Sequence, residues 1–159
     1  MITDRTQADV DEALLIRGKV QNGETLTTDE QTKYFNGMRG AYNISDLNRV
    51  ESKVGEIRET LLMYGYPAFG ILTKINWANT DLLKYSDINR YLLNIRKLRE
   101  AYFTYPQTPA TPFTSDWINY ITANDIEQIL VDIEEILDGM ISSFYFTTEI
   151  YSGDQMGVI

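Results

Sequence analysis

Six carboxylates between residues 125 and 138 are the side chains of this sequence best suited to do chemistry. They are Asp125, Glu127, Asp132, Glu134, Glu135 and Asp138. Two carboxylates that share a cleft and have separated pKa values can act as general acid and general base. Opposite a stripe of isoleucines at helical spacing, however, the same run is typical of a solvated helix face. We therefore interpret it as a solvated polar face and predict no catalytic residue.

Other residues and motifs that support catalysis or bind cofactors are few in this sequence. The chain has no histidine and no cysteine, which removes the commonest general base, the commonest transition-metal ligand and any thiolate chemistry. No phosphate-binding glycine loop, serine nucleophile motif or calcium loop occurs. We expect no cofactor and no metal. A wall-degrading lytic transglycosylase needs only one glutamate and so remains an open enzyme class, but the carboxylate run offers no isolated buried glutamate.

Length and charge narrow the class further. At 159 residues the chain fits a single domain. A net charge of −9 would repel a phosphate backbone, so we expect no nucleic-acid partner. No apolar run of about 18 residues is present, and the first residues are polar and acidic, so we expect neither a membrane span nor a signal peptide.

A short helix-start pattern recurs four times. Its central residue is an aspartate followed by Val, Leu or Ile, and the four aspartates are Asp9, Asp46, Asp87 and Asp125. Three residues before three of them stands a residue of N-cap type, namely Thr6, Asn43 and Thr122. Lys84 breaks the pattern, so we expect Tyr85 or Ser86 to cap the third unit. The spacings of 37, 41 and 38 residues predict internal repeats that begin near 6, 43, 84 and 122.

Apolar stripes with alternating steps of three and four residues follow these starts, which predicts amphipathic helices. The clearest stripes are Leu47, Val50, Val54, Ile57 and Leu61; Ile88, Tyr91 or Leu92, Ile95, Leu98 and Tyr102; and Ile126, Ile129, Ile133, Ile136 and Met140. We predict five helices, at about 6–20, 28–38, 45–63, 86–103 and 123–143. The predicted fold class is therefore mainly α, a small helical bundle built from repeated capped helix units.

Two connections, 65–84 and 104–120, are longer than ordinary bundle loops. Such loops can return along a whole helix, so both a parallel and an up-down arrangement stay open. Each carries one tryptophan, Trp77 or Trp117, which we interpret as pinning the loop to the core. The prolines at 106, 109 and 112 have polyproline spacing, and we favour a stiff connector over a recognition ligand.

The Asn-Arg pair at 48–49 recurs at 89–90. An arginine in the first turns of a helix opposes the helix dipole. We expect Arg49 and Arg90 to pair with the capping aspartate of a neighbouring element or with a partner subunit.

The C-terminal part differs from the rest. We predict a helical domain over 1–143 and an extended tail over 144–159, because residues 144–151 are aromatic and β-branched. The tail has two open interpretations: it covers its own core as an edge strand, or it pairs with a neighbouring molecule. We favour the second, with partner-binding residues Phe144, Tyr145, Phe146, Ile150 and Tyr151.

Several short motifs occur together and in order along nearly the whole chain. They are Asp4-Arg5-Thr6-Gln7-Ala8-Asp9-Val10, Gly40-Ala41-Tyr42-Asn43, Asp46-Leu47-Asn48-Arg49-Val50-Glu51, Lys74-Ile75-Asn76-Trp77, Asp87-Ile88-Asn89-Arg90-Tyr91, Asn124-Asp125-Ile126-Glu127 and Tyr151-Ser152-Gly153-Asp154. This string resembles a family of small proteins from phages and prophages of Gram-positive gut bacteria, usually regarded as virion components near the tail-tip, baseplate or fibre genes. The motifs cap and pack helices, and the resemblance implies no catalytic residue.

The resemblance implies a non-enzymatic structural subunit of a phage particle, in the tail, baseplate or fibre attachment. Its expected partners are other virion proteins and further copies of itself, and its expected location is the virion, assembled in the host cytoplasm. The alternatives are a head or neck component, a capsid–fibre anchor, and a small phage regulatory or host-interaction protein.

Overall fold

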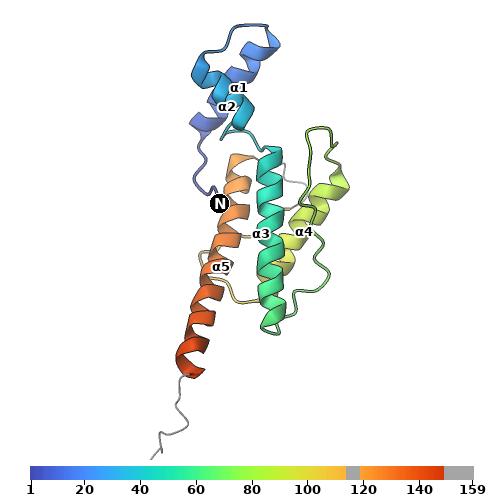
Figure 1. The fold of residues 1–159 in the computed structure, drawn as a ribbon, viewed down its shortest axis with the longest axis vertical. Helices are drawn as coiled ribbons and strands as arrows, with labels where there is room; N and C mark the ends of the chain where they lie inside the picture. The colour runs from blue at the N-terminus through green and yellow to red at the C-terminus, as the bar shows by residue number, and fades with distance from the viewer. Residues whose placement is uncertain (114–118, 149–159) are drawn as a thin grey trace, which may run out of the picture.

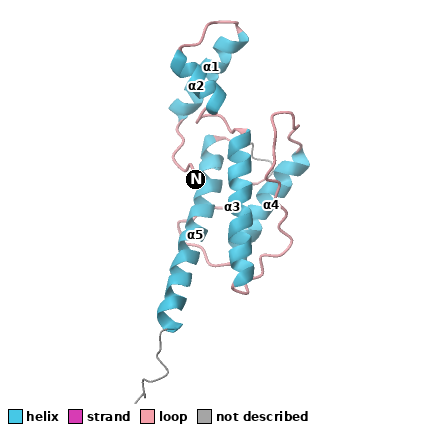
Figure 2. Ribbon diagram, viewed as in Figure 1, coloured by secondary structure: helices cyan, strands magenta, loops and turns pink. Residues whose placement is uncertain are grey.

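The computed structural model describes residues 1–113 and 119–148 of the chain, and all regular structure in these ranges is helical (Figure 2). The helices are α1 (Gln7–Gln21), α2 (Thr28–Asn36), α3 (Ile44–Met63), α4 (Tyr85–Ala101) and α5 (Tyr120–Thr148). This confirms the predicted mainly α class. None of the helices is both long and apolar enough to cross a membrane, within the residues described.

The repeated aspartates start three of the helices as expected. Asp9, Asp46 and Asp87 each occupy the third helical position and accept a hydrogen bond from the backbone N–H of the N-cap residue, at 2.7, 2.8 and 3.1 Å. The N-cap of α4 is Lys84, so the expectation that Tyr85 or Ser86 caps this helix is wrong. The lysine side chain has no hydrogen-bond acceptor, so the carboxylate of Asp87 alone caps α4, by accepting the backbone N–H of Lys84.

Helix α5 begins three residues earlier than predicted. Asn119 accepts hydrogen bonds from the N–H groups of Ile121 and Thr122, at 2.9 and 3.0 Å, and Thr122 accepts one from the N–H of Asn119. Thr122 therefore holds the position that Asp46 and Asp87 hold elsewhere. Asp125 lies in the second turn, and the prediction that it starts the helix is wrong, because two polar residues upstream form a competing cap.

Helices α3, α4 and α5 run parallel to one another (Figure 1). At one end, Arg49 of α3 contacts Glu127, eight residues into α5. At the other end, the hydroxyl of Tyr66, just after α3, donates to the sulfur of Met140, and its ring packs on Tyr102, just after α4. The long connections carry the chain back to the starting end each time. This decides the question that the sequence left open.

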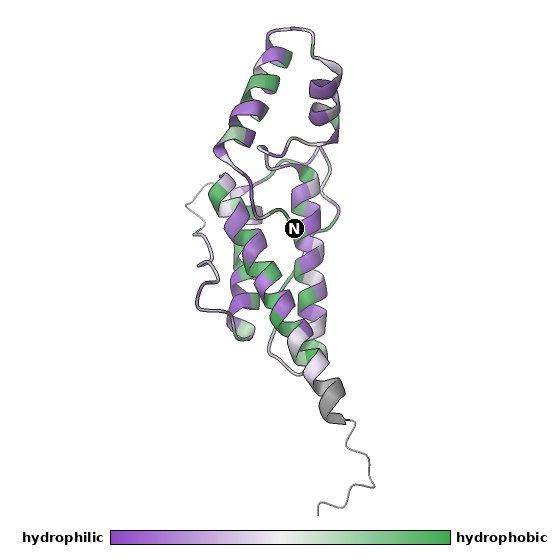
Figure 3. Ribbon diagram, turned by 90° about the vertical axis from the view of Figure 1, so that its left-hand side faces the viewer, coloured by the Kyte–Doolittle hydropathy of each residue, from purple (hydrophilic) through white to green (hydrophobic). Residues whose placement is uncertain are grey.

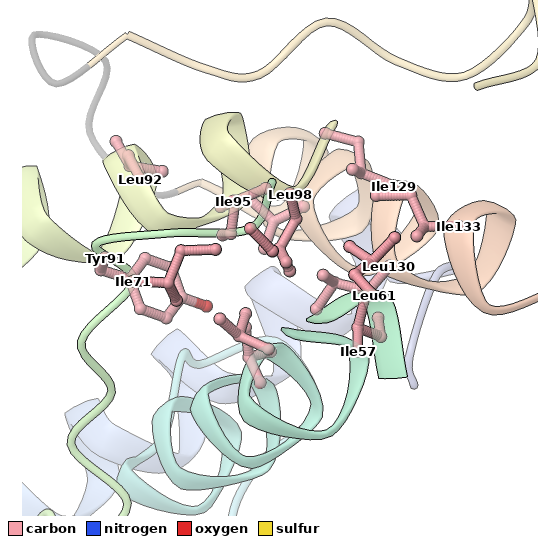
Figure 4. Close-up of a cluster of buried hydrophobic side chains, with 14 of the residues drawn as sticks. Ile57, Leu61, Ile71, Tyr91, Leu92, Ile95, Leu98, Ile129, Leu130 and Ile133 are labelled. Atoms are coloured by element: carbon pink, nitrogen blue, oxygen red, sulfur yellow. The ribbon is translucent and has the colours of Figure 1, made fainter. Parts of the chain in front are cut away.

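The three predicted stripes form one core (Figure 4). Ile136 is the exception: it is not part of the core, which instead includes Leu130 and Leu137 of α5. The core side chains point toward one another between α3, α4 and α5, together with Ile71 from the connection before α4. Residues of the three stripes that are at most 5% exposed are Leu47, Val50, Val54, Ile57, Leu61, Tyr91, Leu92, Ile95, Leu98, Ile126, Ile129 and Ile133. Ile88, Tyr102 and Met140 pack at the edge of the core, only partly buried.

Helices α1 and α2 form a separate hairpin that projects beyond one end of the bundle (Figure 1). Only Ala13 and Ile16 of α1 are buried, and α2 has no buried residue. Green apolar patches on the hairpin therefore lie among hydrophilic positions without a core of their own (Figure 3). Two ion pairs hold its helices together, Lys19 with Glu30 at 2.6 Å and Lys33 with Glu12 at 2.7 Å.

The predicted extended tail is wrong for residues 144–148, which continue α5 to Thr148. β-Branched and aromatic residues have only a small intrinsic bias against helix, and a preceding helix of 24 residues supplies the costly nucleus. Ile150 and Tyr151 lie outside the described residues, as does Trp117. The proposed partner contact through Phe144, Tyr145, Phe146, Ile150 and Tyr151 stays a prediction.

The hairpin meets the bundle through a direct backbone contact at Gly40. A Cβ atom at this position would lie 2.0 Å from the carbonyl oxygen of Asp9 and 2.4 Å from the nitrogen of Val10. Gly40→Ala should therefore lower the free energy of unfolding by about 1–3 kcal/mol, because backbone cannot move aside as a side chain can. Gly139→Ala is the matched control. It has no atom within 4 Å and should stabilise α5 by roughly 0.5–1 kcal/mol. Equal effects in chemical denaturation would contradict the close contact.

Candidate functional site

A cluster of four charged side chains lies at the end of the bundle where α3 and α5 begin. Arg5 Nη2 lies 2.8 Å from Glu127 Oε1 and 3.2 Å from Asp46 Oδ1. Arg49 Nη2 lies 2.7 Å from the same oxygen of Asp46 and 2.8 Å from the same oxygen of Glu127. Arg5, Asp46 and Glu127 are at most 4% exposed. The two cations and two anions thus balance each other inside the protein.

The N-terminal segment completes this cluster. The N–H of Ile2 donates to Glu127 Oε2 at 2.6 Å, and Arg5 Nη1 donates to the carbonyl of Ile2 at 2.8 Å. The guanidinium of Arg5 also lies 5.6 Å from the centre of the Tyr42 ring, a cation–π distance. Residues 1–6 are therefore held against α3 and α5 by charge-assisted hydrogen bonds, which are stronger than neutral ones.

A second ion pair connects α3 to α4. Glu51, 1% exposed, binds Arg90, with Nη1 at 2.9 Å. Glu51 Oε2 also accepts the backbone N–H of Lys74 at 3.0 Å, and Arg90 donates to the carbonyl of Leu72 at 2.6 Å. Arg49 and Arg90 do pair with carboxylates of neighbouring helices, Glu127 and Glu51. These partners are not capping aspartates, so that part of the expectation is wrong; the capping aspartate that Arg49 contacts, Asp46, lies on its own helix.

Three asparagine side chains each bond both the N–H and the C=O of one residue in a connecting segment, as a neighbouring strand would. Asn48 accepts the N–H and donates to the carbonyl of Trp77, at 2.8 and 3.0 Å. Asn94 does the same with Leu72, and Asn124 with Arg5. Trp77 is buried, and Lys74 Nζ lies 3.7 Å from its ring centre, so Trp77 does pin its loop to the core.

The interpretation of the 125–138 carboxylates as a solvated face is wrong for two of them. Glu127 is fully buried, and Asp132 is 6% exposed. Asp132 accepts hydrogen bonds from Thr108 at 2.5 Å and from Gln128 at 2.6 Å. Thr108 belongs to the proline-containing connection, which Arg99 also holds through the carbonyl of Pro109. The connection is therefore packed on the bundle, as expected for a stiff connector.

The position of Glu127 bears on the lytic transglycosylase class, which needs a single glutamate and which the sequence left open. Glu127 is a buried glutamate, contrary to our expectation, but two arginines and the N–H of Ile2 occupy its oxygens. Its surroundings hold a structural carboxylate and leave none of its oxygens facing a cleft. Partial burial raises the pKa of Asp125, in the neighbouring turn. Within the two described ranges no group of three or more carboxylates is placed to hold a metal ion.

Sequence reasoning missed the buried roles of Glu51 and Glu127, although a signal was present. Both are the eighth residue of their helix, and both follow an asparagine three residues earlier, Asn48 or Asn124. The repeated Asn-x-aliphatic-Glu pattern, Asn48-Arg-Val-Glu and Asn124-Asp-Ile-Glu, marks the positions that hold returning backbone. Aligning the repeats on Asp125 instead of Thr122 concealed this register.

Two surface grooves flank the junction of hairpin and bundle. One, of about 490 Å³, is lined by Arg5, Val10, Tyr42 and the first residues of α5. The other, of about 610 Å³, lies between Phe35 of α2, the start of α3 and Trp77. Large apolar side chains are also exposed on the hairpin, among them Leu14, Leu15 and Phe35. Such surfaces are typical of contacts with other proteins.

No protein-family model, curated protein or solved structure matches this chain.

The ion-pair cluster distinguishes Asp46 from Asp87, although both occupy the third position of their helix. Asp46→Ala should lower the free energy of unfolding by about 3–5 kcal/mol, because it leaves Arg5 buried with an incomplete set of partners. Asp87→Ala removes the same helix-start hydrogen bond without an ion pair and should cost on the order of 1 kcal/mol. Equal losses of stability in urea unfolding would show that the cluster adds nothing beyond capping.

Buried Tyr91 and its partly buried partner Tyr42 predict a loss of stability at high pH. The hydroxyls of Tyr42 and Tyr91 are hydrogen-bonded, and burial raises the pKa of both. The unfolded chain releases these protons near pH 10 while the folded chain retains them, so the stability that they contribute is present below about pH 10 and lost above it. Tyr91→Phe should therefore make the melting temperature fall less steeply from about pH 9 to 11.

Tyr85→Phe is the control for this experiment, because Tyr85 is 70% exposed. Its melting temperature should fall with pH as that of the unmodified protein does. Parallel curves for all three proteins would mean that Tyr91 and Tyr42 do not govern the alkaline transition.

Proposed function

We propose that this chain is a structural, non-enzymatic subunit of a phage particle, in the tail or baseplate region or its fibre attachment. It acts through protein–protein contacts within the virion. The proposal rests on one observation above others. The α1–α2 hairpin projects from a well-packed bundle and exposes Leu14, Leu15 and Phe35 to 59, 55 and 80%.

The distribution of polar groups supports the same proposal. The buried carboxylates Asp46, Glu51, Glu127 and Asp132 all hold helices, loops or the N-terminal segment in place. Such a framework gives a rigid body from which the hairpin extends. A rigid body with a capped hairpin at one end that exposes large apolar side chains suits a component that occupies a fixed place in a larger assembly. The resemblance to phage virion proteins supplies the setting.

The test is incorporation into particles. Mass spectrometry of purified particles should detect the chain, and it should be made with the late structural proteins. The double variant Leu14→Ser/Phe35→Ser should fold normally but enter particles at a fraction of the normal copy number. Met63→Ser, which changes a side chain that is 78% exposed at the opposite end of α3, should be incorporated normally. A chain made early and absent from particles would instead favour a regulatory protein.

A further inference from the structure

The connection between α3 and α4 contains a segment without turns whose backbone is bonded by side chains of the helices. Residues 71–77, the return segment, run without turn or bend. Asn94 binds both backbone groups of Leu72, at 3.3 and 2.7 Å, and Glu51 accepts the N–H of Lys74 at 3.0 Å. Side chains of α3 and α4 thus take the place of a neighbouring strand along one edge of this segment.

Between Leu72 and Ile75 the other edge of the return segment is open. In extended backbone, the N–H and C=O of successive residues point to opposite sides, so those of Thr73 and Ile75 face away from the bonded groups of Leu72 and Lys74. The open edge ends before Trp77, whose N–H and C=O are both bonded to Asn48. Within the described ranges, the backbone groups of Thr73 and Ile75 have no hydrogen-bond partner, and both residues are exposed. Phe69, Leu72 and Ile75 surround this edge and are 60–71% exposed. An uncovered edge of this kind is a template for another strand.

The charge around the edge is opposite to that of the molecule. Residues 64–103 contain six basic and three acidic side chains, although the whole chain has a net charge of −9. Nine of the 14 basic side chains have a carboxylate partner within 4 Å among residues 1–113 and 119–148. Of the other five, four lie on α4 or at its N-cap: Lys84, Arg96, Lys97 and Arg99. Arg99 is bonded to the carbonyl of Pro109 in the other connection, whereas Lys97 donates to the carbonyl of Gly70, next to the return segment. The positive charge on this side of the molecule favours an acidic partner for the edge.

We propose that the return segment binds residues 149–159 of a second copy of this chain as an added β-strand. That segment contains Glu149 and Asp154 and no basic residue, and it includes the β-prone pair Ile150-Tyr151. It starts at the far end of α5, whose last turns extend beyond the ends of α3 and α4 (Figure 1). The end of α5 that precedes the donor segment and the acceptor edge lie at different places on the molecule, so the contact is head-to-tail and builds a ring or a filament. This inference rests on the proposed role as an assembling subunit and identifies one of its contacts.

Sedimentation velocity of the full chain over a range of concentrations tests the proposal. The chain should self-associate, and a synthetic peptide with the sequence of residues 149–159 should dissociate the assembly, whereas a scrambled peptide should not. Ile75→Pro removes a backbone donor that has no partner in the monomer, so helicity and melting temperature should be unchanged while association is lost. Ile75→Ala retains that donor and should still associate.

A second pair of variants tests the charges independently of the backbone. Arg96→Glu/Lys97→Glu should weaken association by about tenfold or more, because it places like charges opposite the acidic segment. Arg17→Glu is the matched control, since Arg17 lies on α1 and has no carboxylate partner in the part of the chain that the structure describes. It should associate as the unmodified chain does.

Several results would overturn the proposal. One is a chain that stays monomeric and does not bind the peptide. Others are association that survives Ile75→Pro, a loss of association with Ile75→Ala equal to that with Ile75→Pro, and association that is unchanged by charge reversal at positions 96 and 97. A monomer whose Thr73 and Ile75 amides are protected from hydrogen exchange would show that the edge is covered within one molecule, which also overturns it. A monomeric chain that is nonetheless found in purified particles would refute this contact alone. Absence from particles would refute the proposed function instead.

Discussion

The parallel arrangement of α3, α4 and α5 depends on buried carboxylates that hold the returning chain. Three parallel helices cannot be joined by short turns, so each connection must travel back along the bundle with its backbone polar groups satisfied. Glu51, Asn94 and Asn48 do this for the connection before α4. Glu127 and Asn124 do it for the N-terminal segment. Without these side chains the extended backbone would exchange its contacts with the helices for water.

Burying these carboxylates is costly, and the arginines offset the cost. A buried charge is tolerated when it is paired and hydrogen-bonded. Arg5 and Arg49 share Asp46 and Glu127, and Arg90 holds Glu51. These pairs bring together residues up to 122 positions apart in the sequence. They therefore specify one arrangement of the helices more strictly than the apolar core does, because many rotations of an apolar stripe bury similar area.

The use of charged residues inside the protein has a consequence for function. The charged residues that usually suggest a reaction are used internally to join segments of backbone. The hairpin and the edge of residues 71–77, by contrast, present apolar side chains and open backbone groups to the outside. A molecule of this design has its specific surfaces at its ends and along one connection, which suits repeated contacts with protein neighbours.

The helices and most of their core follow from local signals in the sequence. Periodic apolar stripes and capping residues are local signals, so the five helices and the buried faces of α3, α4 and α5 could be predicted from them. The Asn-x-aliphatic-Glu pattern was also in the sequence, but its meaning depends on what contacts it. Whether Glu127 faces water or Arg5 is decided by two segments 122 residues apart, and no local pattern records that distance.

The direction of the helices, the start of α5 and the helical conformation of residues 144–148 depend on interactions that no stripe or capping motif records. Long loops permit both parallel and antiparallel packing, and the choice follows from which backbone groups find side-chain partners. Asn119 outcompeted Thr122 as the cap because its carbonyl reaches two free N–H groups. Aromatic and β-branched residues at 144–148 joined α5 because extending an existing helix costs less than starting a strand that has no neighbour.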